Sequence, residues 1–112
     1  MISLPDSDLV IMKEIFSKYP EIEEVILFGS RAKGTNRPGS DVDIVLKGKG
    51  GNAVAIALST FLNQESCFPY FFDVIDYQSI DHQPLIDHIN RVGKLIYIKS
   101  SENQNLEPVF KL

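Results

Sequence analysis

The chain has 112 residues, 44% of them hydrophobic and 23% charged, which suits one globular domain with one core and excludes a disordered or fibrous protein. Its formal net charge of −4 argues against general nucleic-acid binding. The single Cys67 excludes an internal disulfide, and no apolar run approaches the roughly 18 residues of a membrane span. Because the N-terminus also lacks the features of a secretory signal, we expect a reduced, soluble, cytoplasmic protein.

Apolar residues spaced three or four apart predict a first helix over residues 6–19, with Asp6 or Ser7 as its N-cap and Pro20 beyond its end. The largely apolar run 24–28 predicts a central strand buried on both faces. The remaining strands and helices alternate along the chain. They are expected over residues 41–46 (strand), 52–65 (helix, capped by Asn52), 70–77 (strand), 84–92 (helix, ended by Gly93) and 94–98 (strand).

The strands and helices together predict one domain over residues 1–98, followed by a polar C-terminal tail over 99–112. The tail carries one apolar cluster, Val109-Phe110, and we expect it to be held loosely unless a partner stabilises it.

Three aspartates mark the candidate site. Asp41 and Asp43 are two residues apart on a predicted strand, so their carboxylates lie side by side on one face and repel each other unless a cation lies between them. Oxygen ligands of this kind favour Mg²⁺, which is usually shared with substrate phosphates. Asp73 lies among apolar residues of another strand, where an unpaired charge is costly, and completing the metal site would explain it. Asp76 is the alternative, but on an extended strand it faces the opposite way.

The segment before the paired aspartates suits a phosphate. Gly29 ends the central strand, and its missing side chain lets backbone N–H groups approach a phosphate, to which Ser30 adds a hydroxyl donor. One helical turn fits after Ser30, and three basic residues follow in the same loop, of which Arg37 is interpreted as an ordinary solvated residue. The predicted nucleotide-binding residues are Gly29, Ser30, Arg31, Lys33 and Ser40.

The pattern fits transfer of a nucleoside monophosphate from an NTP. Two metal ions about 4 Å apart can stabilise both the attacking and the leaving oxygen at phosphorus. Asp41 and Asp43 are expected to bridge both ions. Asp73 is expected to complete the metal nearer the acceptor and to help remove the proton from its hydroxyl, while pyrophosphate leaves on the other metal.

The motif Gly29-Ser30, ten residues, Asp41-x-Asp43 resembles the DNA polymerase β-type nucleotidyltransferase superfamily, and within it the minimal nucleotidyltransferases, over residues 22–98. The resemblance implies an α/β (α+β) palm-like fold in which a mixed sheet of about four strands packs with helices. It also implies Mg²⁺-dependent transfer from ATP or another NTP. Such proteins often pair with a small helical HEPN protein, and some are antitoxins that add AMP to a tyrosine of a HEPN ribonuclease.

Two other functions remain open at this point. The chain could be a non-catalytic nucleotide-binding module that neutralises a partner by masking its surface. It could also modify a small molecule, as aminoglycoside nucleotidyltransferases do, with a separate subunit supplying the acceptor site. The sequence does not distinguish a homo-oligomer from a hetero-oligomer.

Overall fold

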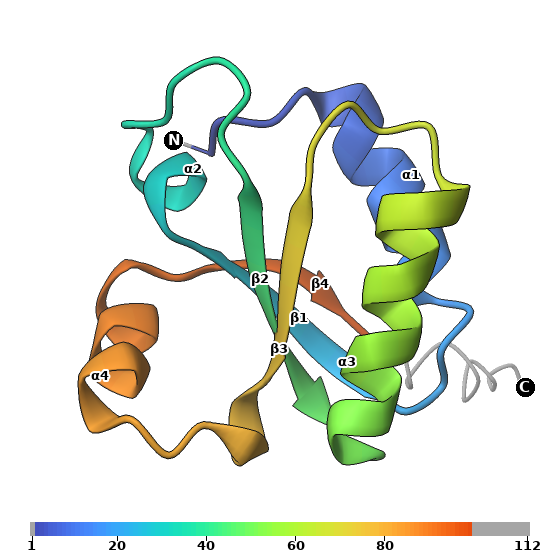
Figure 1. Ribbon diagram of the computed structural model, residues 1–112, viewed down its shortest axis with the longest axis vertical. Coiled ribbons are helices and arrows are strands. Elements are labelled where there is room, and N and C mark those ends of the chain that lie inside the picture. The colour runs from blue at the N-terminus through green and yellow to red at the C-terminus, as the bar shows by residue number, and fades with distance from the viewer. Residues whose placement is uncertain (1, 100–112) are drawn as a thin grey trace, which may run out of the picture.

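Helices and strands alternate through residues 2–99, the part of the chain that the computed structural model describes (Figure 1). The elements in chain order are α1 (Asp6–Phe16), β1 (Ile22–Phe28), α2 (Ser30–Lys33), β2 (Val42–Gly48), α3 (Gly51–Thr60), the π-helix η1 (Phe61–Glu65), β3 (Phe72–Asp76), the 3-10 turn η2 (Tyr77–Ser79), α4 (Gln83–Val92) and β4 (Lys94–Ile98). Among these residues, no helix has both the length and the apolar character that crossing a membrane requires.

The four strands form one mixed sheet with the order β3-β2-β1-β4. The inner strand β1 runs antiparallel to both of its neighbours, β2 and β4, whereas β2 and β3 are parallel. A parallel pair needs a crossover connection, which α3 and η1 supply. The mixed sheet and the central position of the 24–28 strand are therefore confirmed.

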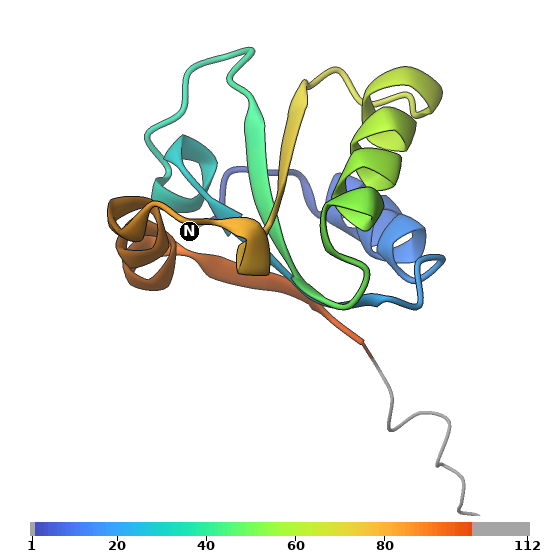
Figure 2. The ribbon, with the colours of Figure 1, turned by 60° about the horizontal axis from the view of Figure 1, so that its bottom comes forward.

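The two faces of the sheet have separate hydrophobic clusters. Figures 1 and 2 show α1 and α3 together on one side of the sheet and α4 on the other. The larger cluster joins α1 and α3 to the first face and includes Phe16, Leu27 and Leu58. The smaller cluster joins α4 to the second face through Phe28 and Ile89. The candidate site lies on this second face, which α4 covers only in part.

Several boundaries differ from the prediction. Helix α1 ends at Phe16 instead of residue 19, and its N-cap is Pro5 without a side-chain hydrogen bond, so the expected capping by Asp6 or Ser7 is wrong. Helix α3 begins after Gly50, whose φ of 92° favours glycine, and not at Asn52. For the starts of both α1 and α3, the backbone conformation of the preceding residue decides where the helix begins, and the sequence pattern does not specify that conformation.

The later elements also shift. The strand expected over 70–77 is shorter, because its ladder with β2 covers only Phe72–Asp76. Of the tail expected over 99–112, only Lys99 is described, and its N–H donates to the Glu23 carbonyl at 2.7 Å. The apolar cluster Val109-Phe110 lies outside the described residues.

Candidate active site

Three carboxylates meet where β2 and β3 begin. Asp43 of β2 is the register partner of Asp73 on the parallel strand β3, and Asp41 lies one residue before β2 begins. Asp41 and Asp73 are exposed, while Asp43 is half-buried between the strands that flank it. Burial, followed by the charges of Asp73 and Asp41, raises the pKa of Asp43 to about 6. The three acids predicted from the sequence are therefore close enough to repel one another.

Asp76, the alternative third acid, lies elsewhere. It pairs in register with Leu46, near the other end of β2, and its side chain is only 4% exposed. Its Oδ2 accepts a hydrogen bond of 2.6 Å from the Ser79 hydroxyl. The structure thus brings Asp73, and not Asp76, beside Asp43.

Gly29 lies directly against the middle carboxylate. It follows Phe28, which pairs in register with Asp43, and its φ of 74° is in the region that glycine tolerates best. A Cβ at this position would overlap Asp43 Oδ2. Ser30 begins α2 directly afterwards, and the first N–H groups of a helix have no partner within it. The missing side chain of Gly29 therefore lets the Asp43 carboxylate lie directly against the backbone that leads into α2.

The Arg31 side chain packs against Tyr70 and the loop that leads into Asp41. Its side chain is only 6% exposed, and its guanidinium lies over the Tyr70 ring at 4.5 Å from the centroid. Nε and Nη2 donate to the Ser40 carbonyl at 3.2 and 2.9 Å, and Nη1 donates to the Ser3 carbonyl at 2.9 Å. These bonds tie Arg31 to the loop that leads into Asp41, and its contact with a phosphate stays a prediction.

Ser40 and Lys33 complete the predicted nucleotide-binding set. The Ser40 hydroxyl accepts a hydrogen bond of 2.9 Å from the Arg37 N–H, and the Ser40 N–H donates to the Arg37 carbonyl at 3.0 Å. Ser40 therefore closes a turn just before Asp41. Lys33 is exposed at the end of α2, so its ammonium group can move toward an anion. Of the basic residues proposed for phosphate, Lys33 is the one whose placement suits that role.

Asn63, which the sequence did not single out, contacts the strand beside Asp73. Its carboxamide hydrogen bonds to both the N–H and the carbonyl of Phe72. One sequence signal was available: asparagine is a poor residue for a helix interior, where its side chain usually bonds to backbone groups instead.

The three carboxylates fit a divalent cation in their chemistry, because they supply the oxygen ligands that Mg²⁺ prefers. Burial raises the pKa of Asp43 most, and a cation would relieve the further contribution that comes from the charges of Asp73 and Asp41. Within residues 2–99, no group of three or more His, Cys, Asp or Glu side chains is arranged so that it could hold a metal ion by itself. Mg²⁺ usually takes several of its ligands from water and substrate phosphates.

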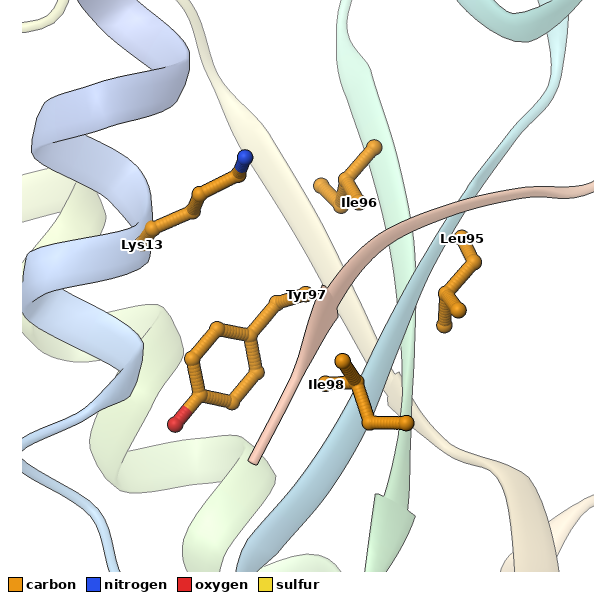
Figure 3. A pocket seen from close by; sticks show the side chains of 5 residues that line it. All are labelled: Lys13, Leu95, Ile96, Tyr97 and Ile98. Atoms are coloured by element: carbon orange, nitrogen blue, oxygen red, sulfur yellow. The ribbon is translucent and has the colours of Figure 1, made fainter. Parts of the chain in front are cut away.

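A separate cavity of about 410 Å³ lies at the free edge of β4, away from the acids (Figure 3). Its lining mixes polar and apolar surface, and the side chains of Leu95 and Ile98 are more than half exposed. The residues around it are Lys13 of α1 and Leu95, Ile96, Tyr97 and Ile98 of β4.

Residues 11–102 match the sequence model of the family described as polymerase beta, nucleotidyltransferase. The chain belongs to this family. It is therefore a nucleotidyltransferase, and the family resemblance identified from the motif is confirmed. No curated protein sequence matches the chain significantly.

Solved structures share the fold. A toxin–antitoxin structure with AMP-PNP superposes with a TM-score of 0.66 at 22% identity, over 91% of this chain and 80% of that one. A tri-AMPylated Shewanella oneidensis HEPN toxin in complex with its MNT antitoxin gives 0.58 at 21% identity, over 87% and 73%. A putative nucleotidyltransferase from Sulfolobus solfataricus gives 0.52 at 23% identity, over 84% and 79%. The nucleotidyltransferase fold expected from the sequence is thereby confirmed.

Proposed function

We propose that this nucleotidyltransferase uses two Mg²⁺ ions to transfer a nucleoside monophosphate from an NTP to a hydroxyl group. The nucleotide that we propose is ATP, so that the transferred group is AMP. The observation that carries the proposal is the register pairing of Asp43 with Asp73 on parallel strands, with Asp41 two residues before Asp43 and Gly29 directly against the Asp43 carboxylate. These three carboxylates would hold the metal ions. The ions, when bound, neutralise phosphate charge and make the acceptor hydroxyl more acidic.

The protein's own groups have distinct tasks in this reaction. Asp41 and Asp43 anchor the metal site, and the exposed Asp73 on the outer strand β3 faces the acceptor and accepts its proton. The acceptor oxygen forms a bond to the α-phosphorus, while the bond from that phosphorus to the bridging oxygen breaks. Pyrophosphate leaves with the electron pair of the broken bond, and Lys33 offsets part of its negative charge.

The acceptor that we propose is a tyrosine of a small helical HEPN-type protein, so that the chain acts as an antitoxin. One solved neighbour of the same fold is an MNT antitoxin in complex with an AMPylated HEPN toxin. Residues 2–99 form a single α/β unit that carries the three acids, and this unit is consistent with a partner protein that supplies the acceptor hydroxyl. Because ATP is abundant in the cytoplasm, we also propose that the protein acts there.

The test is transfer of label from α-³²P-ATP to a HEPN protein encoded beside this gene, in the presence of Mg²⁺. The Asp41→Asn, Asp43→Asn double variant should abolish labelling. Asp81→Asn, which removes an exposed acid outside the site, is the matched control and should leave labelling unchanged. Absence of labelling by the wild-type protein with each of the four NTPs would contradict the proposal.

The apolar edge of β4 favours a second candidate, neutralisation of the partner by masking its surface. Leu95 and Ile98 are 54% and 60% exposed, beside the cavity shown in Figure 3. The two functions make different predictions in cells. If the Asp41→Asn, Asp43→Asn variant still neutralises the partner while Leu95→Ser, Ile98→Ser does not, masking is the function.

A further inference from the structure

The carboxamide of Asn63 uses its oxygen and both of its amide protons in hydrogen bonds. Its Oδ1 accepts from the Phe72 N–H at 2.7 Å, and its Nδ2 donates to the Phe72 carbonyl at 2.9 Å. Nδ2 also donates to the Ser59 hydroxyl at 3.2 Å. Since an amide nitrogen has two protons, the Ser59 contact uses the second one and fixes the rotation of the group. Phe72 is the residue directly before Asp73.

The helix that carries Asn63 departs from α-helical geometry at this point. Residues Phe61–Glu65 form the π-helical turn η1, in which the Ser66 N–H bonds to the Phe61 carbonyl, five residues back, at 3.0 Å. Short π-helical turns are rare and occur frequently at functional sites. Asn63 lies in the middle of this turn, and its carboxamide contacts β3.

The contact takes the place of a missing strand. β3 is an edge of the sheet, so β2 satisfies only one side of its backbone, as when the Val42 N–H donates to the Phe71 carbonyl at 2.9 Å. The N–H and carbonyl of Phe72 point to the other side, where Asn63 bonds to both as a neighbouring strand would. Among residues 2–99, no other side chain hydrogen bonds to the main chain of β3.

We infer that Asn63 is a positioning residue, which holds the start of β3 so that Asp73 stays beside Asp43; the inference rests on the proposed function. An edge strand held from one side can shift, and a displacement of about 1 Å at a catalytic group can cost about a hundredfold in rate. The two bonds to Phe72 oppose that displacement from the outer side of the strand.

The experiment measures metal-dependent nucleotide binding, which does not require an acceptor. Calorimetry with the non-hydrolysable analogue AMP-CPP gives the Mg²⁺ concentration at half-maximal binding for the wild type, Asn63→Ala and Gln64→Ala. Gln64→Ala is the matched control, because it removes an exposed carboxamide from the same turn. Asn63→Asp keeps an acceptor for the Phe72 N–H but loses the donor to its carbonyl, and it serves if Asn63→Ala does not fold.

We expect Asn63→Ala to need about ten to a hundred times more Mg²⁺ for half-maximal AMP-CPP binding, as is usual when a residue that supports a metal ligand is removed. Gln64→Ala should have the wild-type Mg²⁺ midpoint, and the midpoint of Asn63→Asp should lie between those of the wild type and Asn63→Ala. At saturating Mg²⁺, kcat for transfer should fall while KM for ATP stays near that of the wild type. A merely structural role would lower the folded fraction without moving the Mg²⁺ midpoint.

Two results would overturn the inference and are easily told apart. A folded Asn63→Ala or Asn63→Asp variant with the wild-type Mg²⁺ midpoint refutes the positioning role alone. Failure of the wild type itself to bind AMP-CPP in a Mg²⁺-dependent way refutes the proposed function, and the role of Asn63 falls with it.

Discussion

Replacing Asp43 by asparagine should stabilise the metal-free protein. The pKa of Asp43 is raised to about 6 by burial and by the charges of Asp73 and Asp41, whereas an aspartate in an unfolded chain titrates near 3.9. A shift of this size corresponds to at most about 3 kcal/mol, at about 1.4 kcal/mol for each pH unit. Since the carboxylate is only half-buried, solvent screening reduces the cost to about 1–2 kcal/mol.

The sign of the pH dependence follows from the raised pKa. The folded protein binds the Asp43 proton more tightly than the unfolded chain does, so this contribution to stability is present below pH 4. It is lost as the pH rises toward 6, and above that the charged form carries its full cost. The difference in stability between Asp43→Asn and the wild type should therefore grow from near zero at pH 4 to its full value at pH 7.5.

Urea denaturation followed by circular dichroism, with EDTA present, measures this difference at each pH. At pH 7.5 the variant should have the higher midpoint, and saturating Mg²⁺ should stabilise the wild type more than the variant. Asp81→Asn, at an exposed acid outside the site, should change stability by less than about 0.5 kcal/mol. If Asp43→Asn is no more stable than the wild type at pH 7.5, or if the difference does not vary with pH, then burial and the neighbouring charges do not raise the pKa of Asp43 and the reasoning is wrong.

Three further changes separate the roles of the loop residues. Gly29→Ala should lower the free energy of unfolding by about 1–3 kcal/mol and weaken Mg²⁺-dependent nucleotide binding, measured by calorimetry, more than tenfold. Gly39 is the control, because it has a similar positive φ but no atom within 4 Å of where a Cβ would lie. Gly39→Ala should therefore lose only the stability that backbone strain costs, and it should retain nucleotide binding. Arg31→Lys should lower the free energy of unfolding by about 1–3 kcal/mol in urea titrations, because an ammonium group cannot reproduce the paired bonds to the loop. Lys33→Gln should instead weaken AMP-CPP binding about three- to tenfold and leave the melting temperature unchanged. If Lys33→Gln loses stability and Arg31→Lys does not, then Lys33 is the structural residue and Arg31 is not.

The sequence predicted those parts of the fold that depend on local patterns. The apolar run before Gly29 predicted an inner strand, because a strand flanked by β2 and β4 and covered on both faces needs apolar residues at successive positions. The spacing of Asp41 and Asp43 predicted a shared face, since side chains alternate along a strand. That Asp73 is the register partner of Asp43 depends on the parallel pairing of β2 and β3, which no local pattern in either strand specifies.

Other features of the site depend on contacts between distant residues. The charge and position of Arg31 suggested a phosphate ligand, but its hydrogen-bond partners are 9 and 28 residues away along the chain. Asn63 was overlooked because its contact with Phe72 depends on a π-helical turn and on β3 being an edge strand. Neither condition is visible in the composition of the segment.

Both exposed carboxylates of the site follow a residue whose backbone is held by a side chain. Arg31 bonds to the carbonyl of Ser40, directly before Asp41, and Asn63 bonds to Phe72, directly before Asp73. Asp43 has no need of such support, because it lies within the ladder between two strands. Since the three charges repel one another until a cation binds, the outer two are the ones free to move apart. Bonds to the preceding backbone oppose this movement and leave the carboxylates themselves available to a ligand.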